Sequence, residues 1–551
     1  MRPLLLTALL ALVAGLAVRS AAAQSRQSDH GTIVIVTGEL ATRPVPTLMD
    51  GAAATSGNSD VANQLFLRLA GVGPTLATAG DRSFVPLLAR SWSRRDSLTL
   101  VFDLDPRARW HDGAPVRAED VVFTMARARD ETITPTLANL LRHISSVTAE
   151  GEQRVVFRFD HVYGEQFYDA TFHVAPLPAH LLARLTPAAF NSAAFVAHPI
   201  GNGPYRWGRS VEGQFQELVA NDSFFLGRPK LDRVIFRLAT DADARINLLL
   251  SGEADALENV APLSNVTRLK ADTMLRLIPV PSRTVGYLLF NTRDPADHSR
   301  PHPILGDLAV RRAIIAALDR PTLARSVFGP YAAVPFGPVS AVLWIGAGSP
   351  APVRQNVAQA RTLLAGAGWR DTDGDGTLAR AGAPLRLQLS LPNTSASRRM
   401  IALQVQEQLR QVGVQLDLVV LERAAWVERR SAGNFDIDFS QADLDPSPSG
   451  LTQSWSCEGG SNVAHYCDAG VDSLFERAIL SPTKGAHLWH QALERLEGDA
   501  PAVFLYTPAK LYAIHRRFRH IDIRPESSWM LLRDWSVAPS ERLPRDDAPG
   551  R

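Results

Sequence analysis

The sequence predicts an α/β fold that is divided among two or three domains. The chain has 551 residues, which is more than one hydrophobic core usually accommodates. Its composition is globular, because 46% of the residues are hydrophobic, 21% are charged and no low-complexity tract interrupts them. Short apolar runs typical of strands alternate with segments of helical periodicity. Such mixed alternation favours strands and helices packed in common layers.

The predicted elements begin with the apolar run 32–36, which we interpret as a buried strand. Residues 96–104 alternate in hydrophobicity and predict a second strand. Residues 118–128 predict a helix, because Glu119 and Asp120 stand in its first turn, where the helix dipole favours acids. Further strands are expected at 154–159, 215–219, 233–238, 274–280, 286–290, 385–391 and 415–421. Further helices are expected at 242–251, 307–318, 355–366, 397–411 and 485–496.

Residues 1–23 match a secretory signal peptide. Arg2 gives a basic start, residues 4–18 form an apolar run, and the small residues 21–23 precede Gln24. The run of 15 residues is shorter than the roughly 20 that a permanent membrane helix needs, which favours cleavage over an uncleaved anchor. No cysteine follows the predicted cleavage site, so a lipid anchor there is not expected. We therefore expect a periplasmic protein.

The charge balance argues against a nucleic-acid partner. The chain has 58 Lys and Arg residues against 56 Asp and Glu residues. Without Arg2 and Arg19 of the predicted signal peptide, the mature chain carries 56 charges of each sign and is formally neutral. The arginines are scattered among acids and form no basic stripe, which a nucleic-acid surface requires.

The two cysteines, Cys457 and Cys467, stand close together in the sequence. In an oxidising compartment such a pair usually forms a disulfide that closes a surface loop. His465 lies between them and allows a zinc interpretation, but the spacing Cys-x7-His-x-Cys matches no standard zinc site. The expected compartment therefore favours the disulfide.

A turn at 371–376 reproduces the start of an EF-hand calcium loop, in which Asp371, Asp373 and Asp375 alternate with other residues. The acid required at the twelfth position is absent, because Gly382 stands there. The sequence favours a tight Asp/Gly turn and leaves calcium binding open.

No catalytic motif is present in the sequence. It contains no His-Glu-x-x-His zinc motif, no Gly-x-Ser-x-Gly nucleophile elbow, no Walker loop and no dinucleotide fingerprint. We therefore expect a protein that is not an enzyme and that needs no cofactor and no catalytic metal.

Two blocks of sequence carry a resemblance to a known family. One is Trp-His-Asp-Gly-Ala-Pro-Val-Arg-Ala-Glu-Asp-Val-Val-Phe at 110–123, and the other is Pro-Ile-Gly-Asn-Gly-Pro-Tyr at 199–205. Further matching blocks stand at 86–92, 98–104, 221–232, 251–255, 290–291 and 307–320. Together, from about residue 32 to 535, they resemble family 5 of the extracytoplasmic solute-binding proteins. That family comprises the oligopeptide, dipeptide and nickel binders of ABC importers.

The resemblance implies a two-lobed periplasmic-binding-protein (Venus-flytrap) fold with an additional third domain. The expected boundaries are 24–70, 199–282 and 500–551 for a discontinuous lobe I, 71–198 for domain II and 283–499 for lobe III. A ligand would be enclosed between the lobes, and hinge closure over it would shift an open–closed equilibrium. The two signature blocks contain turn residues and a helix start, so we expect them to serve the fold rather than ligand contact.

The resemblance also implies a carboxylate for the α-ammonium group of a bound peptide. In the peptide-binding members that aspartate stands in an Asp-x-x-Asp/Glu-Pro context. Asp443, Asp445 and Pro446 correspond to it here, with a spacing one residue shorter. We interpret Asp443 as the ligand-binding residue, since a desolvated ammonium group needs a paired carboxylate. The alternative is that Asp443 and Asp445 only cap a turn before Pro446.

One departure from the family concerns the carboxylate of the ligand. Dipeptide binders of the family place an arginine in the loop that corresponds to 391–397, and this loop has none. Arg398 and Arg399 are the candidate replacements, although we expect one of them to be a helix-surface charge. The departure argues against strict dipeptide specificity and leaves open longer peptides held by backbone pairing as an added strand. Trp455 and Tyr466 are candidate pocket residues or, alternatively, core aromatics.

The predicted function is that of a periplasmic substrate-binding component of an ABC importer. The protein would bind a peptide-like or other small organic solute as a monomer and deliver it to a permease in the inner membrane. One alternative is a receptor for a nickel or metallophore complex, for which only His465 is an obvious ligand. Others are a sensory binding protein and a periplasmic hydrolase, which the missing catalytic motifs disfavour.

Overall fold

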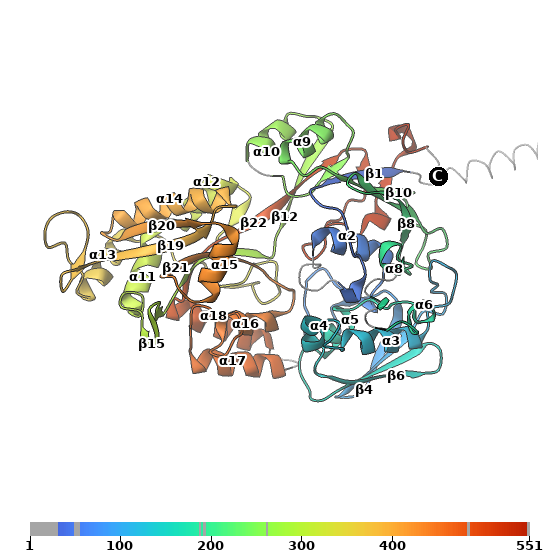
Figure 1. Cartoon of the computed structure of the whole chain (residues 1–551), viewed down its shortest axis with the longest axis horizontal. Coiled ribbons are helices and arrows are strands. Elements are labelled where there is room, and N and C mark those ends of the chain that lie inside the picture. Colours follow the sequence, from blue (N-terminus) through green and yellow to red (C-terminus); the bar gives the residue numbers. More distant parts are fainter. Residues whose placement is uncertain are drawn as a thin grey trace, which may run out of the picture.

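The computed structural model of the chain shows two lobes joined by long strands (Figure 1). It describes residues 31–48, 55–186, 189–190, 194–260, 263–481 and 485–547. The predicted signal peptide, residues 1–23, lies outside these residues. In the described part of the chain, no helix is both long enough and apolar enough to cross a membrane.

Lobe I is built on a sheet whose centre is β1 (Thr32–Thr37), the strand predicted from its apolar run. β1 pairs in parallel with β10 (Arg233–Leu238) and β11 (Ala256–Leu257), and β9 (Phe215–Ala220) and β8 (Tyr205–Val211) follow antiparallel at the outer edge. β1 is almost entirely buried, as expected for a parallel strand covered on both faces. The lobe also contains α2 (Ser56–Leu65), α9 (Ala242–Leu250), α10 (Leu263–Lys270), β23 (Phe518–Arg519), β24 (Ser536–Val537), and the 3-10 helices η1 (Pro46–Leu48), η4 (Leu532–Asp534) and η5 (Pro539–Glu541).

Lobe III is built on three parallel strands, β19 (Arg386–Pro392), β20 (Gln415–Leu421) and β21 (Ile437–Asp443), with β13 (Thr284–Phe290) antiparallel beside β21. Helix α14 (Ala396–Arg410) connects β19 to β20 and packs with the strands in one hydrophobic core. The lobe also contains α11 (Leu308–Ala317), α12 (Arg320–Phe328), α13 (Val357–Gly366), α15 (Arg423–Ser431), α16 (Leu451–Trp455), α17 (Ala469–Leu480), α18 (Gly485–Asp499), η3 (Pro448–Gly450), β14 (Arg293–Asp294), β15 (Asp297–Pro301), β16 (Ala332–Ala333), β17 (Ala379–Arg380) and β18 (Ala383–Pro384).

One long strand, β22 (Ala502–His515), runs through both lobes. Its first part pairs with β13 in lobe III, and its remainder pairs with β12 (Leu275–Pro281) and with β11 in lobe I. The chain crosses between the lobes a second time from β12 to β13, where the expected boundary between residues 282 and 283 lies. Because β22 belongs to both sheets, residues 502–506, expected in lobe I, contribute to the sheet of lobe III.

Domain II contains a four-stranded antiparallel sheet that stands apart from the large sheet of the lobes. The strands follow in the order β4 (Ala89–Asp96), β5 (Thr99–Leu104), β7 (Arg154–Phe159) and β6 (Ile144–Glu150). The other elements are α3 (Ala118–Ala128), α4 (Pro135–Leu140), α5 (Gln166–Thr171), α6 (Ala179–Leu182), α8 (Ala194–Ala197), β2 (Ala70–Val72) and β3 (Phe84–Pro86).

The elements predicted for domain II are confirmed in part. The helix expected at 118–128 is α3. The single strand expected at 96–104 is wrong at its start, because residues 97–98 form a hairpin turn between two strands. The Asp96 carboxylate accepts the Leu98 N–H at 2.8 Å, and this local bond closes the turn. Polar residues within an alternating pattern hid this break.

The two signature blocks tie α3 and lobe I together, as expected for residues that serve the fold. Trp110 Nε1 donates to Asp120 Oδ2 at 3.1 Å, and Asp120 lies in the first turn of α3. His111 Nδ1 accepts the Gly201 N–H at 3.1 Å, which joins the first block to the second. Burial lowers the pKa of His111 to about 4, so the ring is neutral at neutral pH. A Cβ at Gly201 would lie 1.8 Å from the Leu65 carbonyl oxygen, so only glycine fits there.

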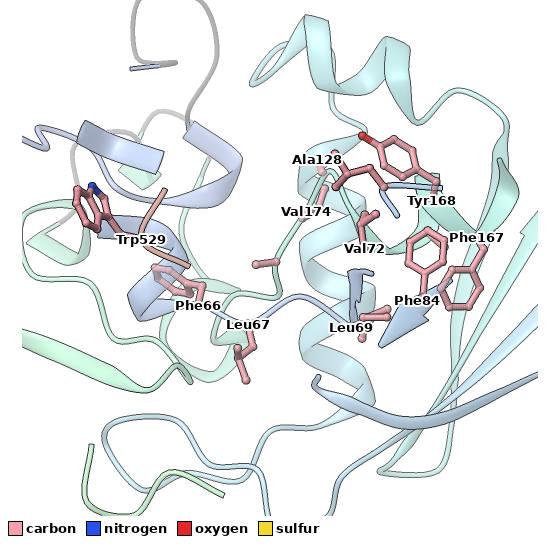
Figure 2. Packing of buried hydrophobic residues seen from close by; sticks show 14 of the residues in the cluster. Phe66, Leu67, Leu69, Val72, Phe84, Ala128, Phe167, Tyr168, Val174 and Trp529 are labelled. Atoms are coloured by element: carbon pink, nitrogen blue, oxygen red, sulfur yellow. The ribbon is translucent and has the colours of Figure 1, made fainter. Parts of the chain in front are cut away.

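Apolar side chains fill the junction between lobe I and domain II (Figure 2). Phe66 and Trp529 lie on the lobe I side, and Phe84, Phe167 and Tyr168 lie on the domain II side. The rings of Phe84 and Phe167 pack edge to face, with centroids 4.6 Å apart. All of these residues belong to one hydrophobic core. Lobe I and domain II are therefore joined by continuous apolar packing.

A buried ion-pair network anchors β1 to the C-terminal part of the chain. The Arg517 guanidinium lies 3.1 Å from Asp255 and 2.6 Å from Asp546, and it donates to the Thr32 carbonyl at 2.6 Å. Asp255 also accepts the Val34 N–H at 2.9 Å. The side chains of Arg517, Asp255 and Asp546 are 2%, 0% and 0% exposed. Their charges therefore compensate one another in the interior of lobe I.

Candidate ligand-binding site between the lobes

The carboxyl ends of three parallel strands meet at one edge of lobe III. β19, β20 and β21 run in parallel, so their last residues, Pro392, Leu421 and Asp443, lie at the same edge. Helix α15 follows β20, and Figure 1 shows it on the side of lobe III that faces lobe I. In open α/β sheets, ligands bind outside the carboxyl ends of the strands. This edge is therefore the candidate ligand-binding edge of lobe III.

Asp443, the residue predicted to bind the ammonium group of the ligand, is the last residue of β21. Its side chain is exposed, and its Oδ1 accepts a hydrogen bond from Thr284 Oγ1 at 3.1 Å. Thr284 begins β13, directly after the chain crosses from lobe I. Asp445 lies 4.0 Å from Arg283, and 62% of its side chain is exposed. Both carboxylates therefore lie beside the hinge and retain oxygen atoms for another partner.

β21 has an unpaired edge that leads to Asp443. Within the described residues, β19 pairs only with residues 437–438 of β21. At the same edge the Phe439 carbonyl accepts a hydrogen bond from Arg398 Nη1 at 3.2 Å. Because the backbone groups of a strand alternate between its two edges, those of Gln441 and Asp443 point to this edge as well. An extended chain can add there as a further strand.

Arg398 and Arg399 occupy different environments at the start of α14. Arg398 is half-buried, and its guanidinium carbon lies 5.6 Å from the centroid of the Trp426 ring. Arg399 is exposed, so it is the helix-surface charge of the pair. Arg398 remains the candidate partner for the carboxylate of a ligand, because it lies beside the unpaired edge of β21.

Arg68, which the sequence patterns do not single out, lies where lobe I meets domain II. It follows α2, and its guanidinium carbon lies 4.6 Å from the centroid of the Phe172 ring. Burial lowers the pKa of Arg68, while the nearby Tyr168, Glu526 and Asp445 oppose this shift. Arg68 of lobe I is therefore influenced by polar side chains of both domain II and lobe III. These residues are far apart in the sequence, so no local motif connects them.

A small cavity lies beside Arg68. Its volume is about 210 Å³, and apolar side chains line it together with the polar residues Asn63, Arg68, Arg524, Glu526 and Arg533. The Glu526 side chain is 2% exposed and lies 3.0 Å from Arg524, and burial raises the pKa of Glu526. Pockets for whole drug-sized ligands have volumes of roughly 300–1,000 Å³, so this cavity suits one side chain of a larger ligand. No sequence signal marks Glu526, because acids are common in loops.

The two candidate aromatic residues are buried in lobe III. Trp455 is 3% exposed, and its ring packs against those of Tyr287 and Phe504 with centroids 5.8 and 5.5 Å away. Tyr466 is also buried, and its hydroxyl donates to Asp499 at 2.8 Å. These placements favour the core interpretation of both residues over direct ligand contact.

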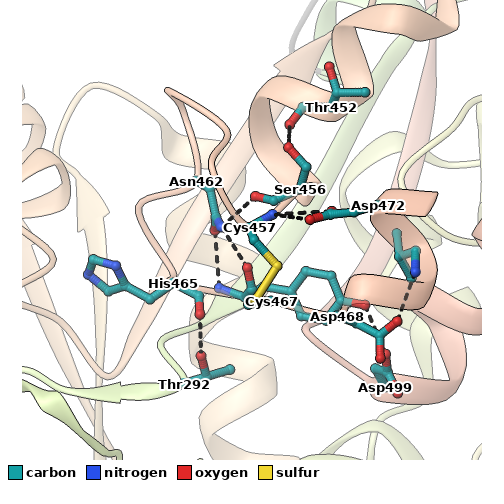
Figure 3. Close-up of a disulfide and its surroundings, with 12 residues drawn as sticks. Thr292, Thr452, Ser456, Cys457, Asn462, His465, Cys467, Asp468, Asp472 and Asp499 are labelled. Carbon is teal, nitrogen blue, oxygen red and sulfur yellow. Dashed lines mark hydrogen bonds between the residues drawn. A yellow bond between two sulfur atoms is a disulfide. The ribbon is translucent and has the colours of Figure 1, made fainter. Parts of the chain in front are cut away.

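The predicted disulfide between Cys457 and Cys467 is present (Figure 3). It closes the loop after α16, and the Asn462 side chain braces this loop by donating to two backbone carbonyls at 2.9 and 2.6 Å. The bonded cysteines leave no thiolate for zinc. The His465 ring lies against that of His298 on β15, with centroids 4.7 Å apart. Figure 1 shows β15 at the lower edge of lobe III, apart from the strands that join the lobes, so His465 does not support a metal complex bound between the lobes.

The aspartates of the calcium-like turn at 371–376 are exposed and lie within 4.8 Å of one another. The Asp371 carboxylate accepts the N–H groups of Gly374 and Gly376 at 2.8 and 3.2 Å. These bonds build the tight turn that the sequence favours.

A second contact joins lobe III to domain II on the side away from β22. The Glu165 carboxylate accepts hydrogen bonds from Ser447 Oγ at 2.6 Å, from Ser449 Oγ and from Thr78 Oγ1. The neighbouring Gly164 N–H donates to a carbonyl of α17 at 2.9 Å. Burial raises the pKa of Glu165, because the three hydroxyl bonds only partly replace its water. The lobes are therefore linked both at the hinge and at this Glu165 contact.

Comparison with known proteins agrees with this architecture. The profile of the bacterial extracellular solute-binding proteins, family 5 (middle), matches residues 83–462. The oligopeptide-binding protein AppA of Bacillus subtilis is 26% identical over 509 residues, which cover 90% of each of the two chains.

Solved structures share the two-lobed fold. The structure of AppA from Bacillus subtilis in complex with a nonapeptide has a TM-score of 0.72 at 24% identity, covering 93% of this chain and 100% of that chain. The structure of NikZ from Campylobacter jejuni in complex with Ni(L-His) has a TM-score of 0.72 at 22% identity, covering 92% and 99%. The family profile covers more than half of the chain. The chain therefore belongs to family 5 of the bacterial extracellular solute-binding proteins.

Proposed function

We propose that this protein binds a peptide at the junction of its lobes and delivers it to the permease of an ABC importer, without catalysing a reaction. The family supports the binding role, and the Bacillus subtilis relative, named for oligopeptides, supports a peptide as the ligand. The observation that carries the proposal is the unpaired edge of β21, which ends at the exposed carboxylate of Asp443.

A peptide laid along this edge finds a partner for each of its charged ends. Its α-ammonium group pairs with Asp443, its backbone with that of Gln441, and its carboxylate with Arg398 beside Phe439. Asp443 lies four residues after Phe439 along the strand, a span of roughly 14 Å. An extended peptide of about four residues covers this distance. The proposed length agrees with the missing arginine in the loop 391–397, which dipeptide binders of the family use.

The proposed site of action is the periplasm. The family consists of extracellular solute-binding proteins, and residues 1–23 have the pattern of a cleavable signal peptide. We propose that the mature protein acts there as a monomer, since one chain supplies both lobes of the site.

Native mass spectrometry of the purified mature protein tests the function. We expect the wild-type protein to carry a small ligand, and denaturation should release peptides whose sequences tandem mass spectrometry can read. Incubation of the recovered peptide with the protein should leave the peptide intact. Recovery of a nickel complex or another non-peptide solute in place of peptides, or cleavage of the peptide, would contradict the proposal.

The Glu165 contact is expected to make peptide affinity depend on pH. In an open form the carboxylate leaves Ser447 and Ser449 and regains water, so its pKa falls to the ordinary value. At a pH between the two pKa values of Glu165, closure of the lobes is therefore coupled to protonation of this carboxylate. Affinity for the recovered peptide should rise as the pH falls through the raised pKa of Glu165, and the gain is lost as the pH rises again through that pKa. Calorimetric titrations at a series of pH values between 7 and the ordinary glutamate pKa measure this dependence.

Two variants separate this effect from other titrating groups. Glu165→Gln should remove the rise in affinity at low pH, because the amide does not titrate. Glu165→Ala should weaken binding at pH 7 by about tenfold, since Ser447 and Ser449 lose their acceptor. Glu131→Gln, an exposed glutamate of the same domain, is the matched control and should keep the wild-type profile. The same pH profile in Glu165→Gln and wild type would exclude this role.

A further inference from the structure

Besides the aspartates of the turn 371–376, a second group of side chains that can bind a metal lies on domain II, apart from the junction of the lobes. β6 begins at Ile144 and β7 ends at Phe159, and these two residues face each other in the ladder. His143 and Asp160 follow just outside the ladder, where the Asp160 N–H donates to the His143 carbonyl at 3.1 Å. His161 is the next residue in the chain. The open end of this hairpin therefore brings two imidazoles and one carboxylate together.

The three side chains meet through the atoms that bind metals. Asp160 Oδ2 lies 3.1 Å from His143 Nδ1, and Asp160 Oδ1 lies 2.6 Å from His161 Nδ1. The two imidazole centroids are 4.5 Å apart, and the three ligating atoms all lie within 4.8 Å of one another. The side chains of His143, Asp160 and His161 are 30%, 48% and 38% exposed. An ion can therefore reach all three from solvent.

The spacing is close to that of a tetrahedral zinc site. With metal–ligand bonds of about 2.0–2.2 Å, neighbouring ligand atoms lie about 3.3–3.5 Å apart. The two imidazoles contact different oxygens of Asp160, at 3.1 and 2.6 Å, and the ligating atoms all lie within 4.8 Å of one another. Binding of one ion through one carboxylate oxygen therefore requires the side chains to shift by roughly 1 Å, and all three are partly exposed.

Neighbouring residues hold the two imidazoles in place. The Tyr163 ring packs against those of His143 and His161, with centroids 5.6 and 5.1 Å away, and its hydroxyl donates to Asp169 at 2.7 Å. Gln166 Nε2 donates to the His161 carbonyl at 3.0 Å. An ordinary surface ion pair joins one imidazole to one carboxylate. Here two imidazoles contact the same carboxylate, and both pack against the Tyr163 ring. Such support around the ligands is typical of metal sites.

We propose that His143, Asp160 and His161 bind a divalent transition-metal ion of the zinc type. Two imidazole nitrogens and one carboxylate oxygen form a ligand set that zinc accepts, and the fourth position stays open to water. The ion connects the last turn before β6 with the end of β7. Its binding should therefore stabilise domain II against unfolding.

Titration of the chelator-treated, full-length mature protein with Co²⁺ tests the proposal through the visible absorption spectrum. One Co²⁺ per chain should give the absorption bands of a four- or five-coordinate site, and Zn²⁺ should displace it. His143→Gln and His161→Gln should each weaken Zn²⁺ binding by about tenfold or more, measured by competition with a chromophoric chelator. Equal melting temperatures of the metal-free variants and the metal-free wild type would show that the fold is kept.

His180→Gln is the matched control. His180 also lies on domain II and pairs with a single carboxylate, Asp112, at 2.7 Å, with 37% of its side chain exposed. This variant should keep the wild-type Zn²⁺ affinity. Asp373→Asn tests whether the Co²⁺ signal comes from ions bound at the turn 371–376. This variant should leave the Co²⁺ spectrum unchanged. Absence of saturable Co²⁺ binding to the wild type, or binding that survives both His143→Gln and His161→Gln, would overturn the proposal.

Discussion

Replacing Arg517 by alanine is expected to lower the free energy of unfolding of lobe I by about 3–5 kcal/mol. The guanidinium lies between Asp255 and Asp546, and all three side chains are almost inaccessible to water. Its removal leaves Asp546 with two backbone donors and Asp255 with Arg545 as its remaining cation, at 2.5 Å. Burying a carboxylate whose charge is not compensated is far more costly than losing a surface ion pair. β1 would also lose the bond from Arg517 to its Thr32 carbonyl.

Urea denaturation followed by circular dichroism measures this loss. Because the protein has several domains, the comparison rests on the midpoint and slope of the transition assigned to lobe I. Arg519→Ala is the matched control, since Arg519 pairs with Glu541 on the surface of the same region, with 55% of the arginine side chain exposed. That variant should change stability by less than about 1 kcal/mol. Equal stabilities of the Arg517 and Arg519 variants would refute the argument from burial.

Replacing Asp443 by asparagine is expected to weaken binding of the recovered peptide by roughly 30- to 160-fold, or about 2–3 kcal/mol. The asparagine keeps the size of the side chain and the contact with Thr284, so the change removes mainly the charge. We choose the lower part of the usual range for a buried charge pair, because Asp443 is exposed in this structure. Isothermal titration calorimetry with the peptide released from the wild-type protein measures the effect.

An N-acetylated form of the same peptide shows whether Asp443 acts on the ammonium group. Acetylation removes that charge, so the wild type should bind the acetylated peptide as weakly as Asp443→Asn binds the free peptide. The variant itself should not distinguish the two peptides. Asp445→Asn, a change at the nearby carboxylate beside Arg283, is the control and should retain the preference for the free peptide. A wild type that binds both peptides equally would rule out the ammonium assignment.

Features with a local signal could be predicted from the sequence. The apolar run 32–36 forms β1, and the acids in the first turn of 118–128 mark the start of α3. The cysteine pair forms the expected disulfide. Each depends on residues close together in the chain, where periodicity, helix capping and loop closure act directly. The break at residues 97–98 escaped this reasoning, because polar residues within an alternating pattern do not reveal a turn.

The candidate site could be predicted only at single positions. The resemblance pointed to Asp443, and the structure places this residue beside the hinge with an unpaired strand edge leading to it. Arg68 and Glu526 carried no signal, since neither belongs to a motif. Trp455 was a candidate because aromatic residues occur both in ligand pockets and in hydrophobic cores. Its packing against Tyr287 and Phe504, which the sequence does not reveal, favours the core.

The sequence by itself determined the family, the α/β character and the cysteine pairing of this protein. Only the tertiary structure decided which charges share a site, which aromatics are buried and which strand edge stays unpaired. The physical reason is that burial and proximity arise when distant segments pack. Asp445 of lobe III influences Arg68 of lobe I only because the two lobes are held side by side through β22, and no local pattern in the chain encodes that proximity.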